Sequence, residues 1–137
     1  MTIYTLGYAR WTVEAVQAKV EDLDAVLVDV RQSPQSSKPG FSRSDLQARL
    51  DNRYVHFPAF GNVNYKEGPV ELADPERGRE QIERLDRAPV LTCGCQNPNQ
   101  CHRSTVATLL SNALGASIEH LRAPGEAGQP TFFENRA

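Results

Sequence analysis

The part of the sequence richest in chemically reactive residues is Cys93-Gly-Cys-Gln-Asn-Pro-Asn-Gln-Cys-His-Arg103, which holds all three cysteines of the chain. An apolar run that predicts a buried strand precedes it, and an apolar stripe that predicts a helix follows it. We therefore expect Cys101, His102 and Arg103 near the first turn of that helix. A helix N-terminus attracts anions, and with Arg and His nearby it lowers the pKa of a thiol. The segment predicts a functional thiol or an anion-binding site.

One interpretation of the cysteines is a reactive thiolate. Cys101 or Cys93 would then be the nucleophile, because a thiolate is the attacking form of cysteine. His56 or His102 would act as acid or base, and Arg103 would bind an anion through its fork of N–H donors. His56 also fits a satisfied histidine of the core.

Two other interpretations remain open. Cys93, Cys95, Cys101 and His102 could bind a metal ion, although zinc usually takes ligand pairs separated by two to four residues and Cys-x-Cys is shorter. The cysteines could also be packing residues, since cysteine is among the most buried residue types. We expect no resident metal and no other cofactor.

A second group of polar residues follows the first two predicted strands. Alternation places Asp29 and Arg31 on one side of a strand and Val30 on the other. They form either an internal ion pair or a functional pair, in which Asp29 transfers protons and Arg31 binds substrate. Tyr8 and Arg10 follow the first strand and would line the same site.

The elements that must position these residues alternate along the chain. Five apolar runs predict strands, at residues 3–6, 25–30, 54–57, 89–93 and 116–121. Four helices are predicted between them: residues 13–20 after Thr12, 43–51 after Ser42, 75–87 after Asp74, and a last helix that starts at Asn97 or Asn99 and ends at Gly115. This order predicts a three-layer αβα single domain of the α/β class over residues 1–121, with a mainly parallel sheet of about five strands. Residues 122–137 would form a C-terminal tail. In such sheets ligands bind at the carboxyl ends of the strands.

Composition narrows the class of protein. The 137 residues are 39% hydrophobic and 23% charged with a net charge of -2, which predicts a folded domain and argues against a protein that coats DNA. No apolar stretch reaches the roughly 20 residues of a membrane span, and no signal peptide is recognisable. We therefore expect a cytoplasmic protein without membrane contact.

Several motifs occur in a characteristic order: Thr5-Leu-Gly-Tyr8, Leu27-Val-Asp-Val-Arg31 with Pro34, Phe41 with Leu46, Tyr54-Val-His56 ahead of Phe60-Gly61, then Cys93 and Cys101-His-Arg103. In this order they resemble the uncharacterised family called domain of unknown function 488. The resemblance covers nearly all of residues 1–121 and implies no particular reaction. The family usually has a histidine where this chain has Tyr8, and often an acidic residue where it has Cys95.

A looser similarity is to rhodanese-like sulfurtransferases. Leu27-Val-Asp-Val-Arg31, together with Cys95 ahead of Arg103-Ser104, is similar to their strand and cysteine loop. Eight positions separate Cys95 from Arg103, more than in the rhodanese loop, so the similarity is one of fold.

The function we expect is an anion-binding, thiol-containing site at the carboxyl ends of the strands, in an enzyme that uses cysteine chemistry on a small anionic substrate. A transferase or hydrolase would fit. The alternatives are a non-catalytic module that binds a nucleotide or nucleic-acid phosphate, and a metal-stabilised structural protein. Cysteine-to-serine substitution separates them, because it should leave phosphate binding unchanged but lower the melting temperature of a metal-stabilised protein.

Overall fold

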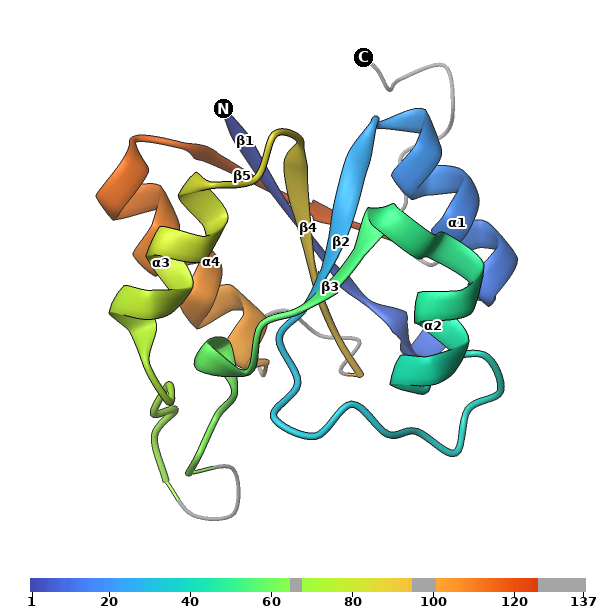
Figure 1. The fold of residues 1–137 in the computed structure, drawn as a ribbon, viewed down its shortest axis with the longest axis horizontal. Coiled ribbons are helices and arrows are strands. Elements are labelled where there is room, and N and C mark those ends of the chain that lie inside the picture. The colour runs from blue at the N-terminus through green and yellow to red at the C-terminus, as the bar shows by residue number, and fades with distance from the viewer. Residues whose placement is uncertain (65–67, 95–100, 126–137) are drawn as a thin grey trace.

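The computed structural model describes residues 1–64, 68–94 and 101–125. Its five strands form one sheet in which every pairing is parallel. They are β1 (Thr2–Gly7), β2 (Ala25–Asp29), β3 (Tyr54–His56), β4 (Ala88–Cys93) and β5 (Ser117–Leu121), in the spatial order β3-β2-β4-β1-β5 (Figure 1). The predicted parallel sheet of about five strands is confirmed.

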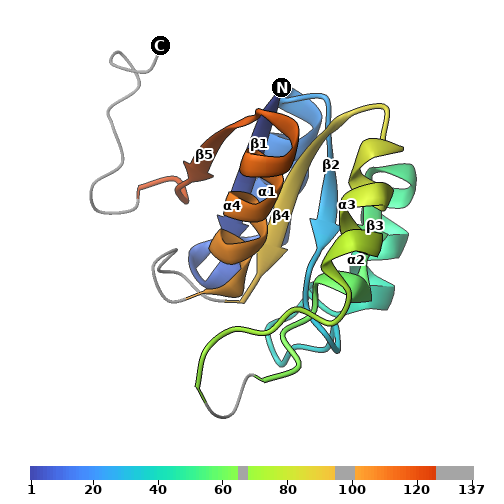
Figure 2. The same cartoon turned by 90° about the vertical axis from the view of Figure 1, so that its left-hand side faces the viewer.

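Helices cover both faces of the sheet. Helices α1 (Val13–Asp22) and α2 (Arg43–Leu50) lie on one face, and α3 (Pro75–Glu83) and α4 (His102–Leu114) lie on the other (Figure 2). Short 3-10 turns, η1 (Tyr8–Arg10), η2 (Asp51–Arg53) and η3 (Pro58–Phe60), join some of these elements. The three-layer α/β class is therefore confirmed.

Strand β2 shows why the sequence folds in three layers. All five of its residues are buried, as expected for a strand covered on both faces. Val26 and Val28 pack into the core under α3 and α4, while Ala25 and Leu27 pack into the core under α1 and α2. Because β-branched and apolar residues alternate between two cores, β2 has no solvent face, and polar groups can appear only at its end.

The predicted helix boundaries rest on capping residues, most of which behave as expected. Thr12 accepts a hydrogen bond from the backbone N–H of Ala15 at 3.1 Å, and Asp74 accepts one from Arg77 at 3.2 Å. Gly115 ends α4 in the left-handed conformation, with φ 67°. Ser42 precedes α2, but its hydroxyl donates to the Asp45 carboxylate at 2.9 Å instead of accepting from the backbone.

The ends of α1 and α2 differ from the prediction by two residues and one, and the end of α3 differs by more. Helix α3 ends at Glu83 and not at residue 87, because the chain turns so that Leu85 packs on the core while β4 begins at Ala88. Helix α4 begins at His102, since Cys101 before it has an extended backbone. The predicted start at residue 97 or 99 lies outside the described residues, as does most of the predicted tail. None of the helices among the described residues has the length and apolar character needed to cross a membrane.

Candidate functional site

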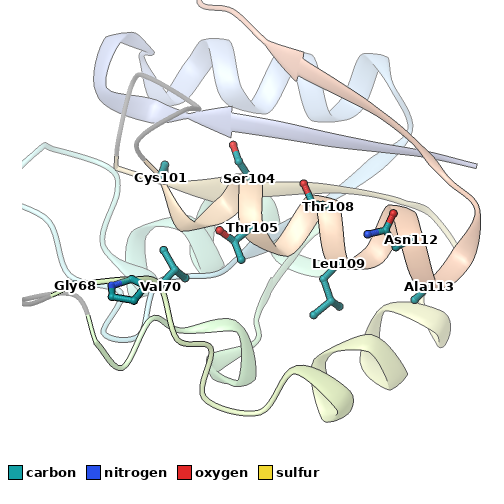
Figure 3. Close-up of a pocket in the computed structure, with 10 residues that line it drawn as sticks. Gly68, Val70, Cys101, Ser104, Thr105, Thr108, Leu109, Asn112 and Ala113 are labelled. Atoms are coloured by element: carbon teal, nitrogen blue, oxygen red, sulfur yellow. The ribbon is translucent and has the colours of Figure 1, made fainter.

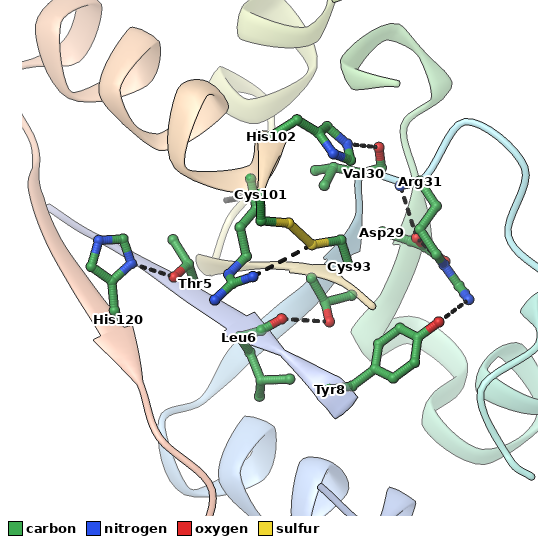
Figure 4. Close-up of a disulfide and its surroundings, with 12 residues drawn as sticks. Thr5, Leu6, Tyr8, Asp29, Val30, Arg31, Cys93, Cys101, His102 and His120 are labelled. Carbon is green, nitrogen blue, oxygen red and sulfur yellow. Dashed lines mark hydrogen bonds and ion pairs between the residues drawn. A yellow bond between two sulfur atoms is a disulfide. The ribbon is translucent and has the colours of Figure 1, made fainter. Parts of the chain in front are cut away.

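The predicted meeting of strand ends at one edge of the sheet is confirmed. Strand register places Gly7 beside Cys93, and it places Asp29 between His56 and Thr92. The first turn of α4 returns to the same edge, next to the end of β4 (Figure 4). Two groups of side chains occupy this edge, one around Asp29 and the other around Cys93.

The Asp29 carboxylate is fully buried and is surrounded by donors. One oxygen accepts from the backbone N–H of Arg31 at 3.1 Å and from its Nε at 2.8 Å. The other accepts from Nη2 of Arg31 and from the hydroxyl of Tyr54, both at 2.6 Å. Of the two interpretations of Asp29 and Arg31, the structure contains the internal ion pair. A proton-transfer role for Asp29 stays a prediction.

Tyr8 completes this group, which we call the Asp29 network (Tyr8, Asp29, Arg31 and Tyr54). Its hydroxyl accepts from Nη1 of Arg31 at 3.0 Å, and its ring stacks on Phe41 with centroids 4.4 Å apart. Burial alone would lower the pKa of Arg31, but the hydrogen bonds and charge of Asp29 outweigh it and raise that pKa. Burial and the bond to Asp29 raise the pKa of Tyr54 well above its ordinary value. Arg31 therefore stays charged and Tyr54 stays protonated at neutral pH.

The second group is built on two cysteines from different elements. Cys93 is the last residue of β4, and Cys101 is the N-cap of α4. Their sulfur atoms are bonded to each other (Figure 4), which the sequence analysis did not predict. Their Cα atoms are 7.6 Å apart, wider than the roughly 4.4–6.8 Å usual for disulfides. The backbone positions therefore also suit two separate thiols that face each other.

Arg103 brings a positive charge to this pair. It lies in the first turn of α4 with only 1% of its surface exposed, and its Nη1 donates to the Cys93 sulfur at 3.5 Å. A cation held beside a cysteine favours its thiolate. Arg103 is therefore placed to act on the sulfur, and a direct contact with a bound anion stays a prediction.

Two histidines are held by consecutive carbonyl groups after β2. His102 Nε2 bonds the Val30 oxygen and His56 Nε2 bonds the Arg31 oxygen, each at 2.8 Å. Because a carbonyl only accepts, both rings donate from Nε2 and their Nδ1 atoms carry the lone pair in the neutral form. Burial, together with the charge of Arg103, lowers the pKa of His102, although the bond to Val30 opposes this shift. His102 is therefore mainly neutral at neutral pH.

Ligand atoms of Cys93, Cys101 and His102 all lie within 4.8 Å of one another. Among the residues that the structure describes, these three form the group that could hold a metal ion. Cys95, which the sequence analysis added to this set, lies outside the described residues.

A pocket of about 490 Å³ opens at the carboxyl edge, between the two groups. Its lining residues come from four segments and are Arg31, Gln32, Ser33, Asn62, Cys93, Gly94 and His102. Asn62 was missed by the sequence analysis, although its place after Gly61 was a signal. A Cβ at Gly61 would lie 2.8 Å from the Cα of Gln32, so glycine allows these two loops to approach closely.

A larger groove of about 1050 Å³ runs along the outer side of α4 (Figure 3). Val70, Thr105, Thr108 and Leu109 are among its lining residues, and it reaches Cys101 at one end. None of its lining residues within the described parts of the chain is charged, so we place the candidate site at the smaller pocket. The cysteine pair lies between the two, with Cys93 toward the pocket and Cys101 toward the groove.

The remaining predicted residue, Arg10, is exposed in η1, after β1. His120, on β5, has its Nδ1 2.5 Å from the buried hydroxyl of Thr5 on the neighbouring strand β1. This contact depends on β5 lying next to β1, which the sequence did not reveal.

Residues 13–110 match the family model described as Domain of unknown function DUF488. The chain belongs to this family. The match to the DUF488 model contains Asp29, Arg31, His56 and the whole cysteine segment, but Tyr8 lies before it. No curated protein and no solved structure matches the chain. Membership of the DUF488 family therefore identifies the domain without naming a reaction.

Proposed function

We propose that this protein is a cysteine-dependent enzyme that carries out thiol–disulfide exchange with a small anionic substrate at the carboxyl edge of its sheet. The observation that carries the proposal is the bonded pair of Cys93 and Cys101, with the buried guanidinium of Arg103 against the Cys93 sulfur. A thiol pair between a strand end and a helix start, beside a cation, can alternate between dithiol and disulfide.

The two sulfurs have different surroundings, which supports different roles. Cys93 lines the pocket together with Arg31 and receives the Arg103 N–H, which favours its thiolate. Cys101 lies at the start of α4, where the helix dipole stabilises a leaving thiolate. We therefore assign the sulfur that bonds the substrate to Cys93 and the sulfur that leaves or resolves to Cys101.

The exchange begins with the oxidised pair. A substrate thiolate attacks Sγ of Cys93, so that a new sulfur–sulfur bond forms while the Cys93–Cys101 bond breaks and its electron pair goes to Cys101. A second substrate thiolate then attacks the substrate sulfur of this mixed disulfide and releases Cys93 as a thiolate. Two substrate thiols lose their protons and two electrons, one substrate disulfide forms, and the protein disulfide is reduced. A disulfide of the same class restores the pair through the reverse steps.

The pocket supports a small anionic substrate. Arg31 keeps a positive guanidinium at its wall, and Ser33, Asn62 and His102 add polar groups around Cys93. The Asp29 carboxylate offsets much of the Arg31 charge. We therefore expect selection for carboxylate-bearing thiols to be modest, and set by shape as much as by charge.

The test uses the full chain with Cys95→Ser, which leaves Cys93 and Cys101 as its only cysteines. The reduced protein is mixed with 5,5′-dithiobis(2-nitrobenzoate), an anionic disulfide whose released thiolate absorbs light, in a buffer with a metal chelator. We expect two equivalents of thiolate and an intact protein disulfide by mass. With Cys101→Ser added we expect one equivalent and a stable mixed disulfide at Cys93.

Two outcomes would contradict the proposal. The first is a reduced Cys95→Ser protein that releases its two equivalents no faster than the unfolded chain. The second is a parent protein in which both sulfurs remain modified and no disulfide forms. In a module that only binds phosphate, phosphate affinity would be unchanged by serine at position 93, 95 or 101.

A further inference from the structure

We infer that the reduced form of this site binds one soft or borderline divalent cation, such as Zn²⁺, through Cys93, Cys101 and His102, with a fourth coordination position that faces the strand-end pocket. The inference rests on the proposed function in one respect only, because it requires that the cysteine pair opens to two thiols.

The first support is the donor set and its spacing. Two sulfurs and one imidazole nitrogen are preferred ligands of zinc, and here these atoms lie within 4.8 Å of one another. Ligands about 2.0–2.3 Å from one tetrahedral ion are themselves roughly 3.3–3.8 Å apart. The three side chains therefore need only small rotations once the bond between the sulfurs is open.

The second support is the orientation of His102. Its Nε2–H donates to the Val30 carbonyl at 2.8 Å, which leaves the lone pair on Nδ1. Histidine ligands of metals characteristically donate their other ring N–H to a carbonyl or carboxylate, which fixes the ring and its tautomer. Figure 4 shows the His102 ring, its bond to Val30 and the two cysteines together. His102 thus already has the outer contact of a metal ligand.

The third support comes from the backbone. The Cα atoms of Cys93 and Cys101 are 7.6 Å apart, which is wide for a direct bond between the sulfurs. An ion between the two sulfurs replaces one sulfur–sulfur bond with two metal–sulfur bonds. This longer bridge suits the observed Cα spacing. The strand end and the helix start can therefore keep their places when the ion binds.

Arg103 is compatible with a bound cation. Two thiolates cancel the charge of a divalent ion, so the guanidinium faces a neutral complex. Its Nη1 can still donate to the Cys93 sulfur, from which it is 3.5 Å away. Hydrogen bonds to ligating groups commonly orient them.

The pocket leaves the fourth coordination position of this metal site open. Structural zinc sites use four protein ligands, whereas sites with three keep a position for water or substrate. Here Cys93 and His102 line the 490 Å³ pocket together with Gly94 and Asn62, which leaves room for such a ligand. Because the disulfide and the ion use the same sulfur atoms, each excludes the other, and the metal would block thiol exchange.

The experiment adds Co²⁺, as a spectroscopic substitute for Zn²⁺, to the reduced full chain with Cys95→Ser under anaerobic conditions. We expect one equivalent to bind with thiolate-to-cobalt absorption, Zn²⁺ to displace it, and the oxidised protein to show no such band. Cys93→Ser, Cys101→Ser and His102→Gln should each weaken binding by more than about tenfold. Circular dichroism of each variant confirms that it folds.

His56→Gln is the matched control. Its ring makes the same kind of bond to the next carbonyl along the chain, but it is outside the cluster. Absence of thiolate-to-cobalt absorption in the reduced parent would overturn the inference. Equal affinity in His102→Gln, or an equal loss in His56→Gln, would also overturn it. Thiol exchange is measured in chelator, so a failure of cobalt binding is distinct from a failure of the proposed function.

Discussion

Two buried arginines at the same edge of the sheet are used in opposite ways. Arg31 bonds both oxygens of the Asp29 carboxylate, and its remaining Nη donates to Tyr8. Arg103 has Nη1 directed at the sulfur of Cys93. One guanidinium therefore pairs with a buried carboxyl group, and the other lies beside a sulfur whose charge depends on its redox state.

The difference separates a hydrogen-bonded support from a cysteine group at the same edge of the sheet. The Asp29 network fixes the end of β2 and with it the carbonyl groups of Val30 and Arg31, which bind His102 and His56. The cysteine group then lies against this fixed support. We expect substitutions in the network to act on folding and substitutions around Cys93 to act on thiol chemistry.

The largest effect is expected for Asp29→Ala. It leaves the buried Arg31 charge without its partner, which should lower the free energy of unfolding by about 3–5 kcal/mol. Urea denaturation measures this loss. The control is Glu83→Gln, which removes an exposed pairing with Arg79 and should have a far smaller effect. Similar losses in the two variants would refute the structural role of the Asp29 network.

Arg103→Met should act mainly on the chemistry. It keeps the apolar stem but removes the charge beside Cys93, so we expect thiol release in the exchange assay to slow by about tenfold or more. Arg103→Lys should restore part of the rate because it retains the charge. An unchanged rate in a folded Arg103→Met protein would show that this arginine has only a packing role.

Tyrosine substitutions sharpen the comparison within the network. Tyr54→Phe removes a donor to the Asp29 carboxylate and should lower the free energy of unfolding by about 1.5–2 kcal/mol. Tyr8→Phe removes only an acceptor of Arg31, which keeps both bonds to Asp29, and should lower it by about 1 kcal/mol. Urea denaturation of both variants measures the two losses in the free energy of unfolding. A larger loss for Tyr8→Phe would contradict the greater weight given to the Tyr54–Asp29 bond.

The smallest effect concerns pH. Burial, with the charges of Arg103 and Arg122, lowers the pKa of His120 in the folded protein below its ordinary value of about 6.5. The unfolded chain therefore binds a proton there first, so stability is full above about pH 6.5 and declines as the pH falls. Melting temperatures between pH 5 and 8 should show this decline, and His120→Gln should make it shallower. An equal or steeper decline of the melting temperature in His120→Gln would contradict a lowered pKa of His120.

Much of the fold could be read from local patterns. The alternation of short apolar runs with capped helices predicted the parallel sheet, and Thr12, Asp74 and Gly115 marked helix ends correctly. Such signals depend on residues within a few positions of one another, so they can be read without the tertiary structure. The end of α3 did not follow its own pattern, because packing of Leu85 against the core decided it.

The site was predicted as a region but not as a set of contacts. Strand ends had to meet at one edge, which gathered Asp29, Arg31, His56, Cys93 and the start of α4. The sequence left open whether Asp29 and Arg31 pair internally, and it did not indicate that the Tyr54 hydroxyl bonds Asp29. These contacts depend on β3 lying next to β2.

The sequence by itself determined the class of fold, the edge of the sheet at which the candidate residues gather and the residue types available there, because hydrophobic period and capping are local properties. Only the tertiary structure decided that the sulfurs of Cys93 and Cys101 face each other, with Arg103 behind one and His102 fixed by Val30. Those relations depend on strand order, with β4 between β2 and β1, and on the start of α4 at His102. Both are set by packing between segments far apart in the chain.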